Sequence, residues 1–147
     1  MSKIYNGGCQ CEHIRYELTG TPWTIYACHC HICQKQSGSA FGLSVIFVEV
    51  EMKITSGTLR HFVREGHEDR MMRCYFCPEC GSRIYHQWYN EEGDLPFLNL
   101  KPGSLDDTSW IKPGAHVWMS SAQGWEAYHE DDLLFDEQTA DLPRFEG

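Results

Sequence analysis

The chain has 147 residues, of which 41% are hydrophobic and 13% aromatic, and this apolar content excludes a disordered chain. Its length is that of one ordinary domain, so we expect a single domain over residues 1–147. A formal net charge of -9 would repel a phosphate backbone or an anionic bilayer. We therefore expect neither a nucleic acid nor a membrane as a partner.

The amino terminus, MSKIYNGGCQC, lacks the apolar segment of a signal peptide, and no apolar run approaches the roughly 18 residues of a spanning helix. These features predict a cytoplasmic protein. Eight cysteines in a reducing compartment are not expected to form structural disulfides, and closely spaced cysteine pairs there usually bind metal.

Short runs of alternating polarity, separated by glycine and proline, predict an all-β fold. In the first run the apolar residues Ile14, Tyr16 and Leu18 occupy every second position, so one face of that strand can be buried. The predicted strands are His13 to Leu18, Thr24 to Cys30, Ala40 to Val48, Met52 to Thr55, Leu59 to Arg64, Arg70 to Tyr75, Arg83 to Gln87, Phe97 to Leu100 and Ala115 to Met119.

Helical structure is predicted to be short. A helical stretch is expected from Ile32 to Gln36, ended by Gly38, and a helical turn from Ser104 to Thr108. The carboxyl end is acidic from about residue 130, and we expect it to form a solvated tail. Its apolar anchors would be Trp125, Leu134 and Phe135.

Four cysteines form two pairs on tight turns. Cys9 and Cys11 follow a Gly-Gly pair, and Cys77 and Cys80 are followed by a glycine. Two such pairs provide the four thiolates of a closed, tetrahedral zinc site. We expect this site to clip the amino-terminal segment to the middle of the chain and to stabilise the fold.

A second cluster consists of Cys28, Cys30 and Cys33. In an extended segment Cys28 and Cys30 share a face, and a turn would bring Cys33 to the same ion. Three protein ligands leave one coordination position open, which distinguishes catalytic from structural zinc. We predict that this cluster is the reaction centre.

Three other side chains compete for the fourth position, and a closed site or a metal-free redox cluster stays open as an alternative. His29 and His31 would point away from the strand cysteines, so a supporting hydrogen bond or surface exposure is expected for them. Cys74 is expected to be a buried free thiol.

Further candidates are less well specified by their context. Gln34, Lys35, Ser37 and Ser39 follow the second cluster and could contact a carboxylate-bearing substrate, or could simply form a turn. Aromatic side chains of Trp88 and Tyr89 could line a pocket. General acid or base candidates by type are His29, His31, His61, His67, His86, His116 and His129, each of which is more simply a surface or core histidine.

Four motifs occur in order from Gly7 to about Phe135. They are GGCQCEHIRYEL, ACHCHICQKQSGSAF, FCPECGSRIY, and GSLDD followed by HVWMSSAQGWEAY. On these motifs the chain resembles the glutathione-dependent formaldehyde-activating enzymes, whose domain also occurs in centromere protein V. Two departures from the family pattern are Glu12, where a glycine is usual, and the extra Cys74.

The resemblance implies a β-tent fold, a small zinc-binding domain of stacked antiparallel sheets with short helical turns. It also implies two zinc ions per chain, a structural one at the first cluster and a catalytic one at the second. The implied activity joins glutathione and formaldehyde into S-hydroxymethylglutathione, or cleaves the carbon–sulfur bond of that product. The resemblance therefore implies that the protein is a carbon–sulfur lyase acting on glutathione or a related thiol. The alternative is a non-catalytic, zinc-stabilised binding module; the oligomeric state stays open.

Overall fold

The computed structural model describes residues 3–66 and 68–147, so the candidate His67 lies outside the described residues. Within this part the helical elements are α1 (His31–Ser37) and the 3-10 turns η1 (Pro102–Ser104) and η2 (Met119–Ser121). None of the helices described is long and apolar enough to cross a membrane. The strands are β1 (Ile4–Gly8), β2 (Arg15–Cys28), β3 (Gly42–Ser56), β4 (Arg60–Glu65), β5 (Met71–Phe76), β6 (Arg83–Asn90), β7 (Gly93–Leu100), β8 (Ala115–Val117) and β9 (Leu133–Leu134).

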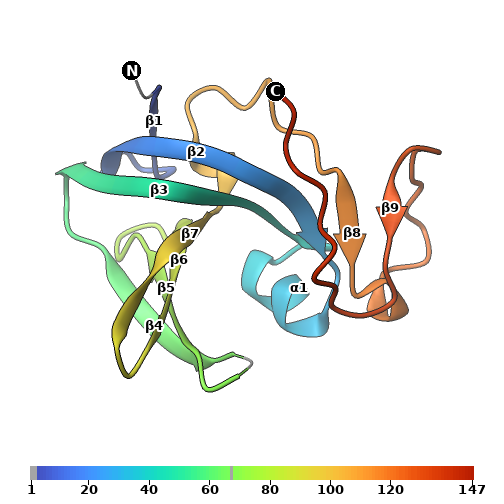
Figure 1. The fold of residues 1–147 in the computed structure, drawn as a ribbon. Coiled ribbons are helices and arrows are strands. Elements are labelled where there is room, and N and C mark those ends of the chain that lie inside the picture. The colour runs from blue at the N-terminus through green and yellow to red at the C-terminus, as the bar shows by residue number, and fades with distance from the viewer. Residues whose placement is uncertain (1–2, 67) are drawn as a thin grey trace.

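The predicted all-β class is confirmed, and the strands of the described chain are hydrogen-bonded into one continuous mixed sheet. Its order is β4-β5-β6-β7-β3-β2-β8-β9, with β1 added to β2. The pairs β2–β8 and β8–β9 are parallel and the others antiparallel. In Figure 1, β4 to β7 descend from one end of the long β2–β3 ribbon, while α1 and β8 lie at its other end.

Two long strands each join a pair of predicted strands. β2 runs through Pro22, where the pairing with β3 shifts register, and a proline is tolerated at such an irregularity because its missing N–H is not needed there. β3 continues through Glu49, which has a positive φ of 51°. The sequence predicted a break in each strand, at Pro22 in the first and at the charged residues near Glu49 in the second. Both strands continue because β2 and β3 pair with each other along their length. The short strands β1 and β9 were not predicted.

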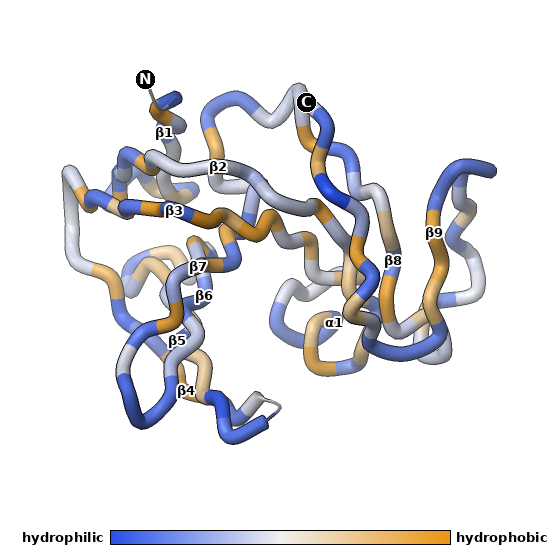
Figure 2. Tube along the Cα trace, viewed as in Figure 1, coloured by the Kyte–Doolittle hydropathy of each residue, from blue (hydrophilic) through white to orange (hydrophobic). Residues whose placement is uncertain are grey.

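The main core lies between the β2–β3 ribbon and strands β6 and β7. The predicted alternation is confirmed, because Ile14, just before β2, and Tyr16 and Leu18 within it are at most 1% exposed. Figure 2 shows the apolar stretches of β3 running over β7, while loop tips are hydrophilic. Burial of this apolar face is the dominant stabilising contribution of the packing. The fully enclosed members are Ile14, Tyr16, Leu18, Ile25, Val45, Phe47, Cys77, Ile84, Leu98, Leu100 and Leu105.

Most of the acidic carboxyl segment is exposed, and main-chain hydrogen bonds hold it along the domain. The Phe135 N–H donates to the carbonyl of His116 at 2.9 Å, and the Phe145 N–H donates to that of Trp23 at 2.7 Å. Figure 1 shows the last residues running beside β2 and β8. Of the predicted anchors, Phe135 packs near the second cysteine cluster, but Trp125 is 73% exposed. Main-chain hydrogen bonds, which the composition does not reveal, hold this segment in place.

Candidate metal centres

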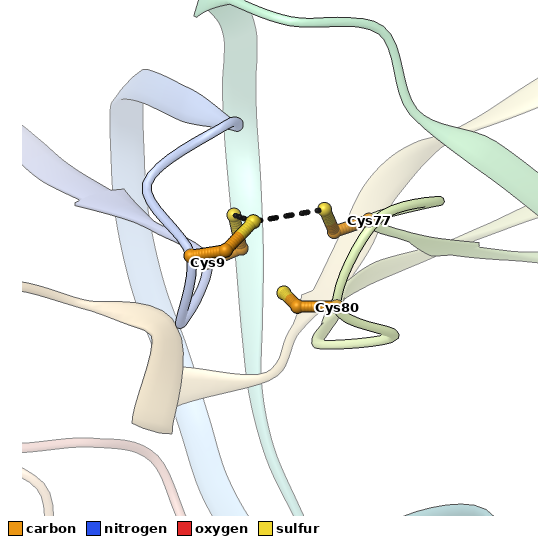
Figure 3. A group of neighbouring side chains, drawn as sticks. Cys9, Cys77 and Cys80 are labelled. Atoms are coloured by element: carbon orange, nitrogen blue, oxygen red, sulfur yellow. Dashed lines mark hydrogen bonds between the residues drawn. The ribbon is translucent and has the colours of Figure 1, made fainter.

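The first cluster brings together four thiols from two distant loops. The sulfur atoms of Cys9, Cys11, Cys77 and Cys80 all lie within 4.8 Å of one another, and Figure 3 shows them converging from opposite sides. Cys9 and Cys11 sulfurs are 3.6 Å apart, and those of Cys11 and Cys77 are 3.8 Å apart. A tetrahedron with zinc–sulfur bonds of about 2.3 Å has edges of about 3.8 Å, so this donor set fits a zinc ion. All eight cysteines are free thiols.

Hydrogen-bond donors surround these sulfurs. The Ile14 N–H donates to the Cys9 Sγ at 3.1 Å, and the Ser82 hydroxyl lies 3.2 Å from the Cys80 Sγ. The Ser82 contact is the main cause that lowers the pKa of the Cys80 thiol to about 5. Donors of this kind favour the thiolate form, which is the form that binds metal. Ser82 also accepts the Gln10 N–H at 3.1 Å and so ties the two loops together.

The loop that holds Cys9 and Cys11 contains a strained residue. Glu12, which stands where the family usually has glycine, adopts a left-handed backbone with φ 66°. Such a conformation costs a non-glycine residue about 1–2 kcal/mol. We expect Glu12→Gly to raise the free energy of unfolding by up to about 1 kcal/mol, because part of this gain is offset by the greater freedom of glycine in the unfolded chain.

Urea unfolding of the metal-loaded protein measures the effect of Glu12→Gly. Glu12→Ala is the matched control, because it removes the same side chain but keeps a Cβ in the left-handed backbone. Equal stabilities for the two variants would contradict a backbone origin and point to the side chain instead.

The second cluster forms where β2 ends and α1 begins. Cys28 is the last residue of β2, Cys30 caps the amino terminus of α1, and Cys33 lies in its first turn. Their sulfur atoms also lie within 4.8 Å of one another. The Cys33 N–H donates to the Cys30 Sγ at 3.3 Å, so the cap of the helix also orders the cluster. Gly42 allows β3 to approach, because a Cβ there would lie 3.1 Å from that of Cys33.

The thiols of this cluster differ in acidity. The pKa of Cys33 is lowered to about 5, first by the hydrogen bond from the Cys28 thiol and then by the positive charges of Lys101 and Arg64. The pKa of Cys28 is raised, chiefly because it keeps the proton that it shares with Cys33. At neutral pH the cluster therefore carries thiolate character where a cation would bind. The three sulfurs fit three positions of a tetrahedral zinc site.

The structure does not bring a fourth ligand to the second cluster. Among the described residues only its three cysteines offer ligand atoms within 4.8 Å of one another. His31 is exposed at the start of α1. Cys74 is buried on β5, where it pairs in register with His86 on β6. The predicted open position is thus consistent with the geometry, and the predicted burial of Cys74 is confirmed.

His29 points away from the cluster into a buried network that the sequence did not indicate. Its Nε2 lies 2.9 Å from the Nδ1 of His116, and its Nδ1 lies 3.2 Å from a carboxylate oxygen of Glu126. The other ring nitrogen of His116 lies 3.5 Å from Asp132. Burial lowers the pKa of His29 despite the carboxylate beside it. Side chains from the residue after β2 (His29), from β8 (His116) and from the carboxyl segment (Glu126 and Asp132) thus support the cysteine loop.

Hydrogen bonds to the main chain of the cysteine loop add to this support. The Gln34 side-chain amide donates to the carbonyls of His29, at 2.8 Å, and of Ser121, at 3.0 Å. The Ser121 hydroxyl also donates to the His29 carbonyl, at 3.1 Å. The HVWMSSAQGWEAY segment therefore clamps the second cluster. The sequence motif by itself indicates no role for Glu126, and Asp132 falls in the predicted solvated tail.

Other predicted candidates lie at several places. Three of the four residues after the cluster, Gln34, Lys35 and Ser39, line a shallow, open pocket together with Trp125, whereas Ser37 caps the end of α1 by accepting the Ser39 N–H. Trp88 packs over Gly66, and Tyr89 lies under the guanidinium of Arg73. The His61 ring lies 5.3 Å from the Tyr75 ring at an interplanar angle of 57°, and His129 is exposed. These contacts give the last four residues packing or surface roles.

His86 is the histidine with the strongest electrostatic perturbation. It is buried, and its Nε2 accepts a hydrogen bond from Arg83 at 3.1 Å, since arginine can only donate. Burial lowers its pKa far below the ordinary value, and the charges of Lys101, Arg83 and Arg64 lower it further. Cys74 faces it from β5. His86 therefore stays neutral in the folded state throughout the physiological range.

This neutral histidine predicts a pH dependence of stability. Below about pH 6.5 the unfolded chain takes up a proton at His86 that the folded chain does not. The free energy of unfolding therefore decreases as the pH is lowered. Between pH 7.5 and 5.5 we expect wild-type protein to lose about 1.4 kcal/mol more than His86→Gln, measured by urea unfolding at each pH. His61→Gln, at an exposed position, should keep the wild-type slope. Parallel slopes for wild type and His86→Gln would contradict the prediction.

The fold and the two thiol clusters define a small all-β protein with two candidate zinc centres. Residues 4–121 match the family described as glutathione-dependent formaldehyde-activating enzyme, and the chain belongs to this family. Its membership supports a glutathione-related, formaldehyde-activating function. Among solved structures, a crystal structure of a Rhodobacter sphaeroides protein is 16% identical, with a TM-score of 0.49, over 74% of this chain and 91% of that chain. A comparison with curated protein sequences gives no significant match.

Proposed function

We propose that the chain is a zinc-dependent carbon–sulfur lyase that acts on glutathione or a related thiol at Cys28, Cys30 and Cys33. The observation that carries this proposal is a cluster of three thiols without a fourth ligand atom from the described residues. In the same proposal Cys9, Cys11, Cys77 and Cys80 bind a structural zinc, because four ligands leave no position for a substrate.

The reaction that family membership suggests is the reversible addition of a thiol to formaldehyde. The sulfur of glutathione adds to the carbonyl carbon of formaldehyde, and a carbon–sulfur bond forms as the π electron pair moves to oxygen. The proton released by the thiol is taken up at that oxygen, and cleavage is the reverse. Zinc, when bound, would hold the substrate sulfur as a thiolate at neutral pH.

The residues of this chain supply the position and the surroundings of that sulfur. The cap of α1 fixes Cys30 relative to Cys33, and the Gln34 and Ser121 contacts hold the main chain of the loop. Three thiolates leave a zinc centre with a net charge of about -1, which makes it a weaker Lewis acid than a three-histidine site. Such a centre favours thiol chemistry over hydrolysis of esters or peptides.

The test combines metal content with turnover. Elemental mass spectrometry of protein purified without added metal should give about two zinc ions per chain. Exchange NMR with ¹³C-formaldehyde and glutathione should then show interconversion with S-hydroxymethylglutathione faster than the spontaneous reaction. Two zinc ions without acceleration of any thiol–aldehyde exchange would favour the alternative, a zinc-stabilised binding module.

A further inference from the structure

Three basic side chains gather beside the second cysteine cluster. Arg64 comes from β4, Arg83 begins β6, and Lys101 follows β7. We call Arg64, Arg83 and Lys101 the cationic cluster. They act together on the pKa of His86, and their charges also act on the thiol of Cys74, so they share one region of the sheet.

Strand register explains how these residues meet. Phe62, Cys74, His86 and Asn99 are consecutive partners across β4, β5, β6 and β7. Arg64 lies two residues beyond Phe62, so its side chain emerges on the same face. A register shift after Tyr75 disturbs the pairing where Arg83 enters the sheet, and Arg83 then reaches His86 on its own strand.

The cationic cluster lacks acidic partners. None of the ion pairs among the described residues includes Arg64, Arg83 or Lys101, although the chain has 21 acidic residues. Lys101 donates to the Ser44 hydroxyl at 2.9 Å, and Arg83 donates to His86. The Nε and Nη1 donors of Arg64 are buried without any acceptor in this part of the structure. Buried charged donors without acceptors are costly, so an acceptor from outside the chain is the expected partner.

The nearby sulfur atoms do not balance these charges. Lys101 contacts Ser44 on β3, two residues from the Gly42 that packs against Cys33. The charges of Arg64 and Lys101 also lower the pKa of Cys33. The cationic cluster therefore borders the proposed reaction centre. A zinc ion with three thiolates has a net charge of about -1, and three cations therefore leave an excess of about two positive charges. Burial raises the pKa of Cys74, which stays neutral. Each of the three residues is partly exposed.

We propose that the cationic cluster binds a carboxylate of the thiol substrate while the sulfur of that substrate occupies the second metal centre. This proposal rests on the proposed function and deepens it, because it selects thiols that carry an anionic group over neutral thiols. Arginine suits the role, since its planar guanidinium can hold a carboxylate with two parallel hydrogen bonds.

Calorimetric titration of the zinc-loaded protein with three probes tests the proposal. Glutathione has thiol and carboxylates, its diethyl ester has only the thiol, and S-methylglutathione keeps the carboxylates but lacks a free thiol. We expect the ester to bind at least about 10-fold more weakly than glutathione. Arg64→Gln should abolish this difference in affinity and should weaken the binding of S-methylglutathione by a similar factor. Lys101→Met should act in the same direction. The matched control, Arg60→Gln, changes an exposed arginine of the same strand.

Thermal unfolding without ligand separates binding from a structural role. Because the Nε and Nη1 donors of Arg64 have no acceptor among residues 3–66 and 68–147, Arg64→Gln should leave the Tm unchanged or raise it. Replacement of a structural arginine would lower the Tm. Equal affinity for glutathione and its ester, or no binding of any probe, would overturn the inference. If Arg64 governs binding as expected but no carbon–sulfur turnover occurs, the carboxylate site stands and the proposed lyase activity fails.

Discussion

Cys77→Ser is expected to lower the zinc content from the proposed two ions per chain to one and to leave the protein largely unfolded at room temperature. Cys77 is fully buried in the main core, and its sulfur lies 3.8 Å from that of Cys11, which is 66 residues away in the sequence. Without the metal cross-link of this loop, the unfolded state gains chain entropy and is stabilised by about 4 kcal/mol. Loss of the metal adds to this, and domains of this size have only about 5–15 kcal/mol of total stability.

Metal analysis and thermal unfolding of Cys77→Ser check this prediction. Cys74→Ala is the matched control, because it also removes a buried thiol but lies outside both clusters. We expect the control to keep two zinc ions and to lose only about 1–2 kcal/mol. A Cys77→Ser protein with two zinc ions and an unchanged Tm would show that the four-cysteine cluster is not a structural metal site.

Cys33→Ser is expected to have the opposite profile, with activity lost and the fold retained. Cys33 packs in a small cluster with Cys28 and Val117, separate from the main core and from the four-cysteine cluster. Serine fits the space of the thiol but is a much poorer zinc ligand. Since changes outside the ligand shell of a metal already cost 10–100-fold, we expect kcat/KM to fall by more than about 100-fold.

Thermal unfolding, metal content and turnover of Cys33→Ser together distinguish the outcomes. His31→Ala is the matched control on the same helix and also tests the alternative in which a histidine closes the site. It should keep two zinc ions and wild-type turnover, because His31 is exposed and outside the cluster. Unchanged turnover in Cys33→Ser would refute the second cluster as the reaction centre.

The sequence determined the parts of this protein that depend on local spacing. Paired cysteines on tight turns predicted the first thiol cluster, the strand spacing of Cys28 and Cys30 predicted the second, and the structure brings both sets of ligand atoms together. Alternation of Ile14, Tyr16 and Leu18 predicted a buried strand face, because side chains in a strand alternate between two sides. The short helix after Cys30 followed from its Gly38 stop, which adopts the left-handed conformation.

Only the tertiary structure decided what surrounds those clusters. Asp132 belongs to the stretch predicted to be solvated, and Glu126 had no predicted role, yet the side chains of both are 7% exposed beside histidines that are distant in the sequence. Arg64, Arg83 and Lys101 are ordinary charges in the sequence, and strand register gathers them beside a cysteine cluster 30 or more residues away. Local pattern cannot reveal such contacts, because the free energy of a buried charge depends on partners that the chain brings together only by folding.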